Sequence, residues 1–527
     1  MFCLIKKTSN KMKKMNFMGC MGILAMTAMM AACSSTNDDP TPEPNPQPGE
    51  DTVYKWTKDG GLNACDHILF DANGKEDANG TVIGNGDQEF VFTGKQQLKK
   101  GTYTLKGWVY IAAGAELTFE PGSVIKGDKT TKATLIAERG GKIIAQGSAT
   151  EPIVFTSAAA AGLRRPGDWG GIILCGKASN NQTEMQIEGG PRTKHGGNDD
   201  ADNSGVLSYV RIEFAGYPFK ADQEINGLTL GSVGSATKID HVQVSFSNDD
   251  SFEWFGGTVN CKYLIAYKGW DDDFDTDNGF SGKVQFGLAV RDPKIADQSQ
   301  SNGFESDNCS DGSQLSPYTT ATFSNITFVG PKSASDFVND KSYITAGNYF
   351  PNNGSGLGRF QAAMQIRRSS RLNCVNSLVM DWPIGLIIDG EKGNTPEEAS
   401  KGTLRLQNIL MANLDIIGSD ANKSYEDKEY DFANKTVKAD SKQSYSHTFF
   451  AAQPGNKALA DKTSLKLTDT KGVGVAIIPQ SGSAVFGAQN FKGLDSWFTS
   501  VNYVGAFNAD DNWLDSWTNF DPQNAKY

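Results

Sequence analysis

Short runs of β-branched and aromatic residues, bounded by Gly, Asn or Asp, recur along most of the chain, whereas helical periodicity is scarce. The clearest stretch follows Trp108 and predicts strands at Leu117–Phe119, Ile143–Ala145 and Ile153–Phe155. Gly and Pro mark the corners between these strands, and the hairpin dipeptide Asn-Gly is mostly absent there. The pattern therefore favours a solenoid of stacked coils over a set of antiparallel hairpins.

The middle of the chain indicates the length of one coil. LSYVRIEF (Leu207–Phe214) and IDHVQVSF (Ile239–Phe246) share apolar first, fourth, sixth and eighth positions, and a third copy starts at Cys261, 22 residues on (261 − 239 = 22). The same step carried forward places Phe286 beside Leu264. Further copies start at Phe323, Leu372 and Leu406. Coils of this length with alternating inward positions predict an all-β fold, a right-handed parallel β-helix.

The first residues have the features of an export signal. Lys13 and Lys14 precede an apolar run, Phe17–Ala32, which ends in small residues directly before Cys33. That run is shorter than the roughly 20 residues of a spanning helix, and a basic start with a small-residue cleavage site is typical of a secretory signal. Because the cysteine stands at the cleavage point, the segment resembles a lipobox, and we expect residues 1–32 to be removed and Cys33 to carry fatty acyl chains such as palmitate.

Residues 33–52 follow as a lipidated, Pro-rich linker. Alternating Pro residues from Pro40 onward make this stretch extended and semi-rigid. The acidic pair Asp38-Asp39 resembles the surface-export signal of Bacteroidota lipoproteins. The expected location is therefore the outer membrane, lipid-anchored and facing the cell surface.

The rest of the chain is expected to form one elongated body. Polar, Gly- and Asn-rich segments at 331–360 and 421–446 are predicted to be loops that leave the coil. The expected order is an N-terminal cap region at 53–105, a parallel β-helix at 106–480 and an aromatic C-terminal cap over the open end at 481–527.

Charge and cysteine content narrow the classes of partner. The net charge of −11 argues against nucleic acid, since proteins that bind it present basic surfaces. The five cysteines after Cys33 are widely spaced, with no CxxC pair, which argues against a redox motif or a zinc site. We expect them to be buried free thiols.

A 22-residue step brings carboxylates of neighbouring coils together. It stacks Asp249 on Asp271 and Asp250 on Asp272. It also stacks Glu253 on Asp275. A third turn, Asn302–Asn308, aligns its Phe304 with Phe252 and Phe274, so Glu305 continues the column of Glu253 and Asp275, and Asp307 lies over Asp277. Two carboxylates about 4.8 Å apart repel by roughly 3.5 kcal/mol at an effective dielectric of about 20. A bound cation, protonation or a basic neighbour must offset this repulsion.

One interpretation of this acidic face is a Ca²⁺ site, because carboxylate oxygens suit that ion. The stretch from Asp273 resembles a DxDxDG loop, but Gly279 falls one place late and Val284 holds the twelfth position, which excludes an EF-hand. The candidate ligands are Asp271, Asp273, Asp275, Asp277, Glu253, Glu305 and Asp307.

Two further interpretations stay open. A polysaccharide lyase or glycoside hydrolase would use clustered carboxylates, with Arg367 as a base in the lyase case; GxSxG, HExxH and P-loop motifs are absent. The candidate catalytic residues are Asp249, Asp250, Asp271, Asp272 and Arg367. Alternatively the acidic residues are corner residues of a scaffold that binds nothing, since Asp and Asn tolerate turn geometry.

Two tryptophans beside the carboxylates are candidate ligand-binding residues. Trp254 and Trp270 could offer aromatic faces to a sugar ring. Together with the acidic face, they suggest a protein that binds glycan or another extracellular polymer, with Ca²⁺ as the stabilising ion.

Several segments carry a family resemblance. GSATEPIVFTS from Gly147, GDWGGIILCG from Gly167, SNDDSFEWFGG from Ser247, DDDFDTDNGFSG from Asp271 and VNYVGAFNADDNW from Val501 resemble a widespread group of bacterial surface lipoproteins and secreted proteins. That group is expected to have the pectin-lyase type of β-helix, and its function is uncharacterised. The resemblance therefore implies a fold and a location, and leaves the ligand open.

Overall fold

The computed structural model describes residues 54–182, 185–187, 192–220, 223–339, 358–420, 430–431, 436–437, 444–511 and 513–527. These residues all belong to the compact unit Tyr54–Tyr527. The expected signal segment, Cys33, the linker and most of the two predicted loop excursions lie outside the described residues. Within the described ranges, no helix is long and apolar enough to cross a membrane.

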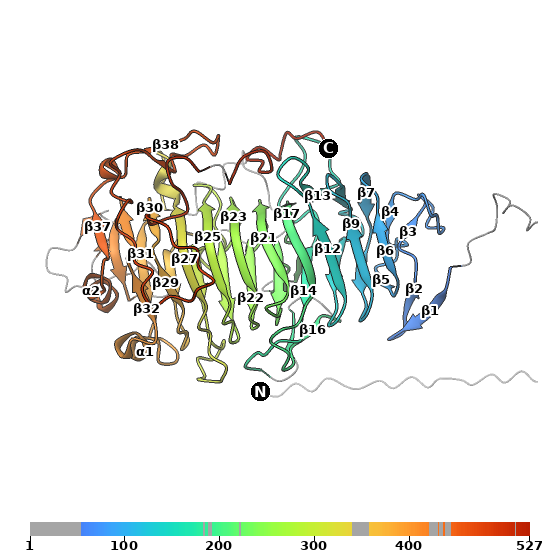
Figure 1. Ribbon diagram of the computed structural model, residues 1–527, viewed down its shortest axis with the longest axis horizontal. Coiled ribbons are helices and arrows are strands. Elements are labelled where there is room, and N and C mark those ends of the chain that lie inside the picture. The colour runs from blue at the N-terminus through green and yellow to red at the C-terminus, as the bar shows by residue number, and fades with distance from the viewer. Residues whose placement is uncertain are drawn as a thin grey trace, which may run out of the picture. The chain divides into compact units, whose positions relative to one another are not determined.

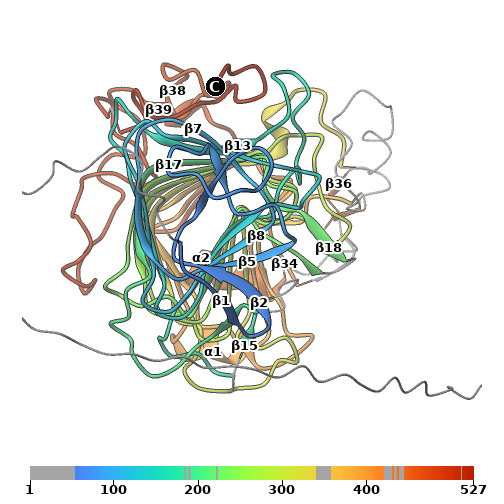
Figure 2. The same ribbon diagram turned by 90° about the vertical axis from the view of Figure 1, so that its right-hand side faces the viewer.

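The body is a right-handed parallel β-helix with three faces, as the sequence predicted (Figure 1). Figure 2 shows the stacked coils from one end. Face 1 is a sheet whose strands are parallel apart from the first hairpin. Its strands are β1 (Trp56–Asp59), β2 (Leu62–Cys65), β5 (Glu89–Phe92), β8 (Trp108–Ile111), β11 (Thr134–Ala137), β14 (Gly171–Cys175), β20 (Leu228–Gly231), β22 (Phe252–Phe255), β24 (Phe274–Asp277), β26 (Phe304–Ser306), β28 (Ala362–Ile366), β31 (Ile384–Ile388) and β34 (Ile416–Ser419).

Faces 2 and 3 are joined by long strands that run through both. These are β17 (Gly205–Glu213), β21 (Lys238–Ser245), β23 (Asn260–Tyr267), β25 (Lys283–Val290) and β27 (Thr322–Val329). Face 2 also holds β6 (Lys95–Leu98), β9 (Glu116–Phe119), β12 (Lys142–Gln146), β29 (Asn373–Val375) and β32 (Arg405–Gln407). Face 3 also holds β4 (Val82–Ile83), β7 (Thr102–Leu105), β10 (Val124–Gly127), β13 (Ile153–Ser157), β30 (Leu378–Met380), β33 (Leu410–Ala412) and β37 (Lys457–Leu459).

Smaller elements decorate the coils. They are β3 (Leu69–Phe70), β15 (Met185–Gln186), β16 (Lys194–His195), β18 (Pro218–Lys220), β19 (Gln223–Glu224), β35 (Tyr430–Asp431), β36 (Thr436–Val437), β38 (Leu467–Thr468), β39 (Ile478–Pro479), α1 (Thr395–Lys401) and α2 (Tyr445–Ala452). Among these, β15 and β16 form an antiparallel pair.

The predicted register is correct for one step and wrong for the next. Ile239 pairs with Cys261, which confirms the step of 22 residues. Leu264, however, pairs with Gly287, so the expected alignment with Phe286 is off by one residue. Phe286 instead stands at the bend between faces 2 and 3, with a left-handed φ of 63°. The step is already 23 residues between Cys261 and Val284, ahead of that bend, whereas Phe255 and Asp277 keep a step of 22. The extra residue therefore enters at the corner between β24 and β25, which hydrophobic alternation alone does not reveal.

Each long strand turns from face 2 to face 3 through one left-handed residue. Tyr209, His241, Tyr263 and Phe286 occupy this bend on successive coils, with φ between 51° and 63°. This conformation is unfavourable for residues other than Gly. The four rings stack, with centroids 4.2, 4.4 and 5.0 Å apart along the series, so ring contacts accompany the strained backbone.

The interior is filled by inward residues that repeat from coil to coil. Phe252, Phe274 and Phe304 form a buried column on face 1, as expected from the sequence. Their ring centroids are 5.6 and 5.9 Å apart. The five cysteines at 65, 175, 261, 309 and 374 are free and buried, as predicted. Because side chains alternate between the two sides of a strand, the residues next to these inward phenylalanines on face 1 point outward.

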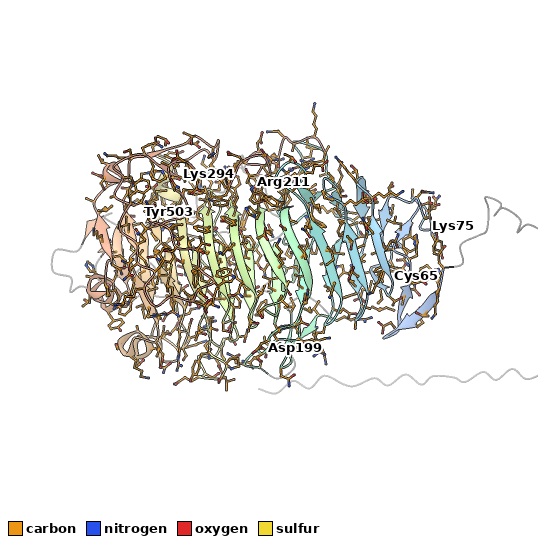
Figure 3. All side chains as sticks on the ribbon, viewed as in Figure 1. Cys65, Lys75, Asp199, Arg211, Lys294 and Tyr503 are labelled. Carbon is orange, nitrogen blue, oxygen red and sulfur yellow. The ribbon has the colours of Figure 1, made fainter. Side chains whose placement is uncertain are left out.

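The C-terminal residues lie along the side of the coil and not across its open end. Gln285 and Thr499 exchange two hydrogen bonds, as do Gln243 and Asn519, and the Lys126 Nζ donates to the carbonyl of Tyr527. The segment therefore runs back toward the early coils (Figure 1; Tyr503 and Arg211 mark this side in Figure 3). The expected end cap is corrected: these aromatic residues cover the bend of faces 2 and 3. Helix α2 packs instead against the last coils, with Ser446 Oγ accepting from the Ile388 N–H.

Candidate functional site

The carboxylates predicted to stack lie on the outer surface of face 1. Thr229, Glu253, Asp275, Glu305 and Gln365 pair in sequence across five neighbouring strands, one residue per strand. They alternate with the buried phenylalanine column, so they point outward. The predicted column of Glu253, Asp275 and Glu305 is thus confirmed, and two neutral polar residues that were not predicted, Thr229 and Gln365, flank it.

A second row of acceptors stands at the corner that precedes these strands. Asp250 Oδ1 accepts the backbone N–H of Asp272 at 2.8 Å, Asp272 Oδ1 accepts that of Asn302, and Asn302 Oδ1 accepts that of Ala362 at 3.1 Å. Each side chain therefore satisfies a backbone donor of the following coil. The corner-residue interpretation applies to this row, although its carboxylates also face those of the column.

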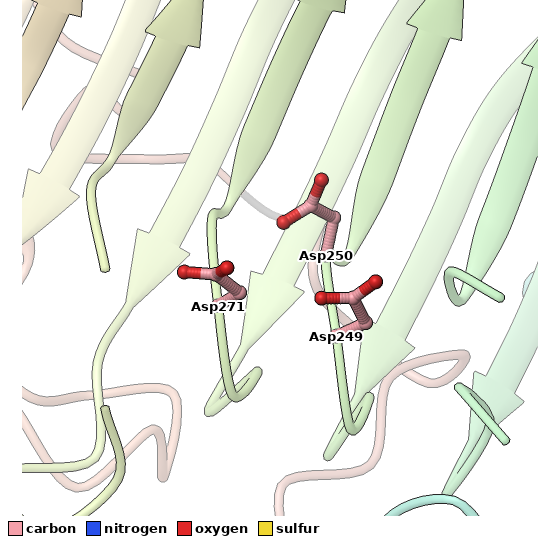
Figure 4. Close-up of side chains that lie close together, drawn as sticks. All are labelled: Asp249, Asp250 and Asp271. Carbon is pink, nitrogen blue, oxygen red and sulfur yellow. The ribbon is translucent and has the colours of Figure 1, made fainter. Parts of the chain in front are cut away.

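The two rows bring carboxylate oxygens within reach of a single ion. Three overlapping groups have one oxygen per residue within 4.8 Å of one another. The groups are Asp249/Asp250/Asp271, Asp250/Glu253/Asp275 and Asp272/Asp275/Glu305. In Figure 4, Asp249 and Asp250 come from one corner and Asp271 from the next. The three groups together contain seven residues, which we call the acidic strip: Asp249, Asp250, Glu253, Asp271, Asp272, Asp275 and Glu305.

Burial and mutual repulsion hold protons on the acidic strip. Burial is the largest cause, followed by neighbouring carboxylates, and the pKa values of Asp250, Asp272 and Asp275 lie well above their usual range. The same causes raise the pKa values of Asp271 and Glu305 to about 7, although Arg367 partly opposes the shift at Glu305. Carboxyl groups with such values share protons near neutral pH or exchange them for a cation.

Two arginines bound the downstream end of the strip. Arg367 pairs with Glu305 and, through Nε, with Asp307 Oδ1 at 2.8 Å; Arg368 Nη1 pairs with Asp307 Oδ2 at 2.6 Å. The two carboxylates raise the already high pKa of Arg367 further. The proposed role of Arg367 as a base is therefore corrected: it is a protonated counter-charge to the carboxylates.

Three members of the predicted ligand set, Asp273, Asp277 and Asp307, lie apart from the three groups. Asp273 is fully buried and paired with the equally buried Arg291, Nη1 to Oδ1 at 3.0 Å. Asp277 is one position beyond the column, beside Asp307, and its pKa is raised to about 7 by burial and by that neighbour. Asp273 and Asp307 are thus paired with arginines. Asp250 and Asp272, which belong to the three groups, replace them as candidate ligands of a cation.

The two candidate tryptophans are buried and cannot stack on a ligand. Trp254 is 0% exposed and lies on the inner side of face 1, with its ring 5.3 Å from that of Phe280. Trp270 is 1% exposed. Sequence neighbours alternate across a strand, so proximity to Glu253 in the chain places Trp254 on the opposite side.

Several buried atoms in the acidic strip and in the two neutral residues that flank its column have no hydrogen-bond partner among the described residues. They are Asp271 Oδ1, Asp275 Oδ1, Thr229 Oγ1 and Gln365 Nε2. Buried polar atoms are normally satisfied, so such a group marks a place where an ion or water binds. Because the donor set consists mainly of carboxylate oxygens, it fits a hard divalent cation.

The fold and this surface define a class of protein, a parallel β-helix with an acidic outer face. Residues 91–455 match the family model described as the pectate-lyase-like beta helix domain. The match covers more than half of the chain, so the chain belongs to this family, in agreement with the resemblance seen in the sequence. No curated protein matches the chain.

One solved structure with some likeness is the crystal structure of Dettilon tailspike protein. The two chains are 11% identical, and the likeness covers 61% of this chain and 62% of the tailspike chain, with a TM-score of 0.20. This chain therefore spans about three fifths of the tailspike chain. A score this low is no basis for transferring a function.

Proposed function

We propose that this protein is a lipid-anchored surface protein whose acidic strip binds Ca²⁺ and, through it, an extracellular acidic polysaccharide or similar polymer. One observation carries the proposal: three overlapping carboxylate groups meet at Asp250 and Asp275, and Asp275 retains a buried oxygen without a partner among the described residues. A divalent cation supplies the missing contact and offsets the repulsion between the carboxylates.

The donor set favours calcium over magnesium. Ca²⁺ accepts six to eight oxygens in irregular geometry, whereas Mg²⁺ needs a near-ideal octahedron. The strip offers carboxylates from three coils without such regular placement. Cations along the strip would leave coordination positions for the anionic groups of a ligand.

The shape of the site suits a polymer. Its column runs along the coil axis, with one carboxylate on each of three successive strands, about 4.8 Å apart. The family is described by its likeness to pectate lyases, whose name gives an acidic polysaccharide as the substrate, and this supports a ligand of that kind. Acyl chains on Cys33 and the Pro-rich linker would hold this face away from the outer membrane.

The proposal is tested by thermal melting with Ca²⁺ and with a chelator. A cation that binds only the folded state stabilises it by about 2.7 kcal/mol at a hundredfold excess over Kd, so the midpoint should rise by several degrees. Asp275→Asn should abolish the rise, while Glu116→Gln, on face 2, should retain it. Affinity gels with acidic polysaccharides should show Ca²⁺-dependent retardation.

If Ca²⁺ neither raises the melting midpoint nor causes retardation in the affinity gels, the interpretation as a scaffold that binds nothing is favoured. Release of unsaturated or reducing ends from a polysaccharide would instead favour the enzyme interpretation. Calcium-dependent retention without such products is the outcome that supports a binding protein.

A further inference from the structure

An apolar loop leaves the coil directly after β13, at residues 158–163. Its sequence is four alanines, a glycine and Leu163, and most of these residues are exposed. Leu163 is 65% exposed, more than any other large hydrophobic side chain among the described residues. Exposed apolar residues are ordinary when they are scattered, whereas a consecutive run of this length is disfavoured unless it makes a contact. The loop is therefore a candidate interaction surface.

The tip of this loop is held in a fixed shape. The Leu163 N–H donates to the carbonyl of Ala160 at 2.9 Å and closes a turn, in which Gly162 has a left-handed φ of 82°. The Gly162 N–H in turn donates to the carbonyl of Gln523, on the C-terminal segment, at 2.7 Å. Among the described residues, a Cβ at Gly162 would meet no atom within 4 Å beyond its chain neighbours. The tip is therefore both anchored from below and open to its surroundings.

Arg164 fastens the loop to the outer side of face 3. Its side chain is buried, and its guanidinium donates to the carbonyls of Ala159 at 3.3 Å and Pro522 at 2.6 Å. The same guanidinium lies 4.9 Å from the ring centre of Tyr527, whose hydroxyl donates to Glu213 Oε1 at 2.6 Å. Figure 1 shows the C-terminal end of the chain beside β13. The loop and the C-terminal segment therefore form one continuous surface over face 3.

Two cations flank the tip. Arg165 follows Leu163 by two positions, and Lys526 is exposed on the C-terminal segment that the loop contacts. Neither side chain makes a hydrogen bond or an ion pair with a described residue; the backbone N–H of Arg165 donates to Asp168 at 2.9 Å. Asp168 itself is buried and paired with Lys129 at 3.3 Å. The charges of Arg165 and Lys526 are therefore available to an external anion.

The surface around the tip has an excess of positive charge on a protein whose net charge is −11. The loop and the segments that adjoin it are residues 126–132, 158–168, 211–213 and 521–527. They hold seven basic and four acidic side chains, paired and unpaired together, which leaves an excess of three (7 − 4 = 3). A carboxylate at the end of Tyr527 would still leave an excess of two. This surface therefore favours an anionic partner.

A lipid bilayer with anionic headgroups fits these features. Small apolar side chains on a convex tip, with cations beside them, can enter the boundary between headgroups and acyl chains. Basic residues near an anionic bilayer strengthen the attachment. A protein partner fits less well, because stable protein interfaces bury about 800 Å² per partner and centre on aromatic or arginine anchors in pockets. Five small residues and one leucine on a projecting turn offer neither.

We propose that the loop at 158–163 docks onto an anionic lipid bilayer, with Leu163 among the acyl chains and Arg165 and Lys526 on the headgroup phosphates. The acidic strip lies on face 1, whereas the loop folds over face 3, so docking leaves the strip accessible. The inference does not rest on the function proposed for the strip. The linker expected at 33–52 spans up to roughly 60 Å at about 3.1 Å per residue, so a lipid anchor at its start allows the loop to reach the same membrane.

The test places an environment-sensitive fluorophore on the loop of the full-length protein, through Leu163→Cys. The five cysteines of the body are buried, and the unchanged protein, treated in the same way, gives the background labelling. With vesicles of phosphatidylcholine and phosphatidylglycerol in equal parts, the emission should shift to shorter wavelength, and lipids brominated in their acyl chains should quench it. Leu315→Cys, at an exposed leucine of another loop, is the matched control and should show neither effect. Arg165→Gln with Lys526→Gln, added to Leu163→Cys, should reduce the shift to its value on phosphatidylcholine alone.

The proposal is overturned if the probe at Leu163→Cys responds to the mixed vesicles no more than the probe at Leu315→Cys, or if the charge variant keeps the full shift. A shift that appears without vesicles and grows with protein concentration would indicate a protein contact and would also overturn it. Leu163 and Lys526 are exposed, so their substitutions leave the core intact. Because chelator is present throughout, a failed calcium site does not affect this result.

Discussion

Asp250 Oδ1 accepts the backbone N–H of Asp272 at 2.8 Å, so a carboxylate of the acidic strip also joins two coils. The same side chain lies among carboxylates that raise its pKa. A structural contact and an electrostatic cost therefore meet at one residue, and substitutions can separate them.

Asp250→Asn keeps an acceptor oxygen and removes a charge, whereas Asp250→Ala removes both. In chelator, we expect the Asn variant to melt higher than the unchanged protein, because repulsion is relieved. The Ala variant should lose about 1–3 kcal/mol of unfolding free energy, since the Asp272 N–H loses its acceptor. Equal losses in both variants, measured by thermal and urea unfolding, would contradict the view that the carboxylates repel.

Stability without cations should fall as pH rises from about 4 to about 7. Asp271, Asp277 and Glu305 have folded-state pKa values raised to about 7, above their ordinary values of 3.8 and 4.5. In this window the folded protein keeps protons that the unfolded chain has released. The contribution of these protonated carboxyl groups to the stability of the folded state is therefore complete below about pH 4 and is lost as the pH rises through about 7. Melting in chelator across this range checks the slope, and Glu305→Gln should flatten it. A steeper fall of stability with pH in that variant would contradict a raised pKa of Glu305 in the folded protein.

Arg367 should matter for stability. Arg367→Gln leaves Glu305 and Asp307 short of a counter-charge in a mostly buried position, at a cost of about 3 kcal/mol. The double variant Arg367→Gln with Glu305→Gln should recover part of this loss in urea unfolding. If Arg367→Gln unfolds like the unchanged protein, the ion pairs do not hold the downstream end of the strip.

The C-terminal segment should stabilise the side of the coil. Trp517 is fully buried, with its ring centre 5.9 Å from that of Tyr209 and 5.7 Å from that of His241. Trp517→Ala should cost about 3–5 kcal/mol, since it uncovers the stacked bend. Trp497→Ala, at a half-buried position, is the matched control and should cost less. A similar small loss from both would mean that the segment is only loosely attached.

The coil length and the stacked carboxylates were predictable because both depend on one repeated step. Ile239 and Cys261 reveal that step, and it aligns Asp250 with Asp272 and Glu253 with Asp275. The next coils are longer, since Glu305 follows Asp275 by 30 residues and Gln365 follows Glu305 by 60 (305 − 275 = 30; 365 − 305 = 60), so the 22-residue step alone does not reach the polar end of the site at Gln365.

Other features depended on information that a repeat does not carry. The extra residue that shifts Phe286 by one position enters at the corner between β24 and β25, which alternation cannot detect. The partner of Asp273 is Arg291, 18 residues away in an adjoining turn, and the side on which Trp254 lies depends on strand phase. The aromatic C-terminus was assigned to the wrong surface, because composition indicates that it packs but not where.

The most direct measurement is calorimetric titration of Ca²⁺ into the chelator-stripped protein near pH 7, in two buffers that differ in protonation enthalpy. Cation binding should displace protons from carboxyl groups with pKa values of about 7, so the observed heat should depend on the buffer. Ca²⁺ should bind with proton release to the unchanged protein and to Glu116→Gln, and both the binding and the proton release should be lost in Asp275→Asn. Absence of binding, or binding that survives Asp275→Asn unchanged, would contradict it.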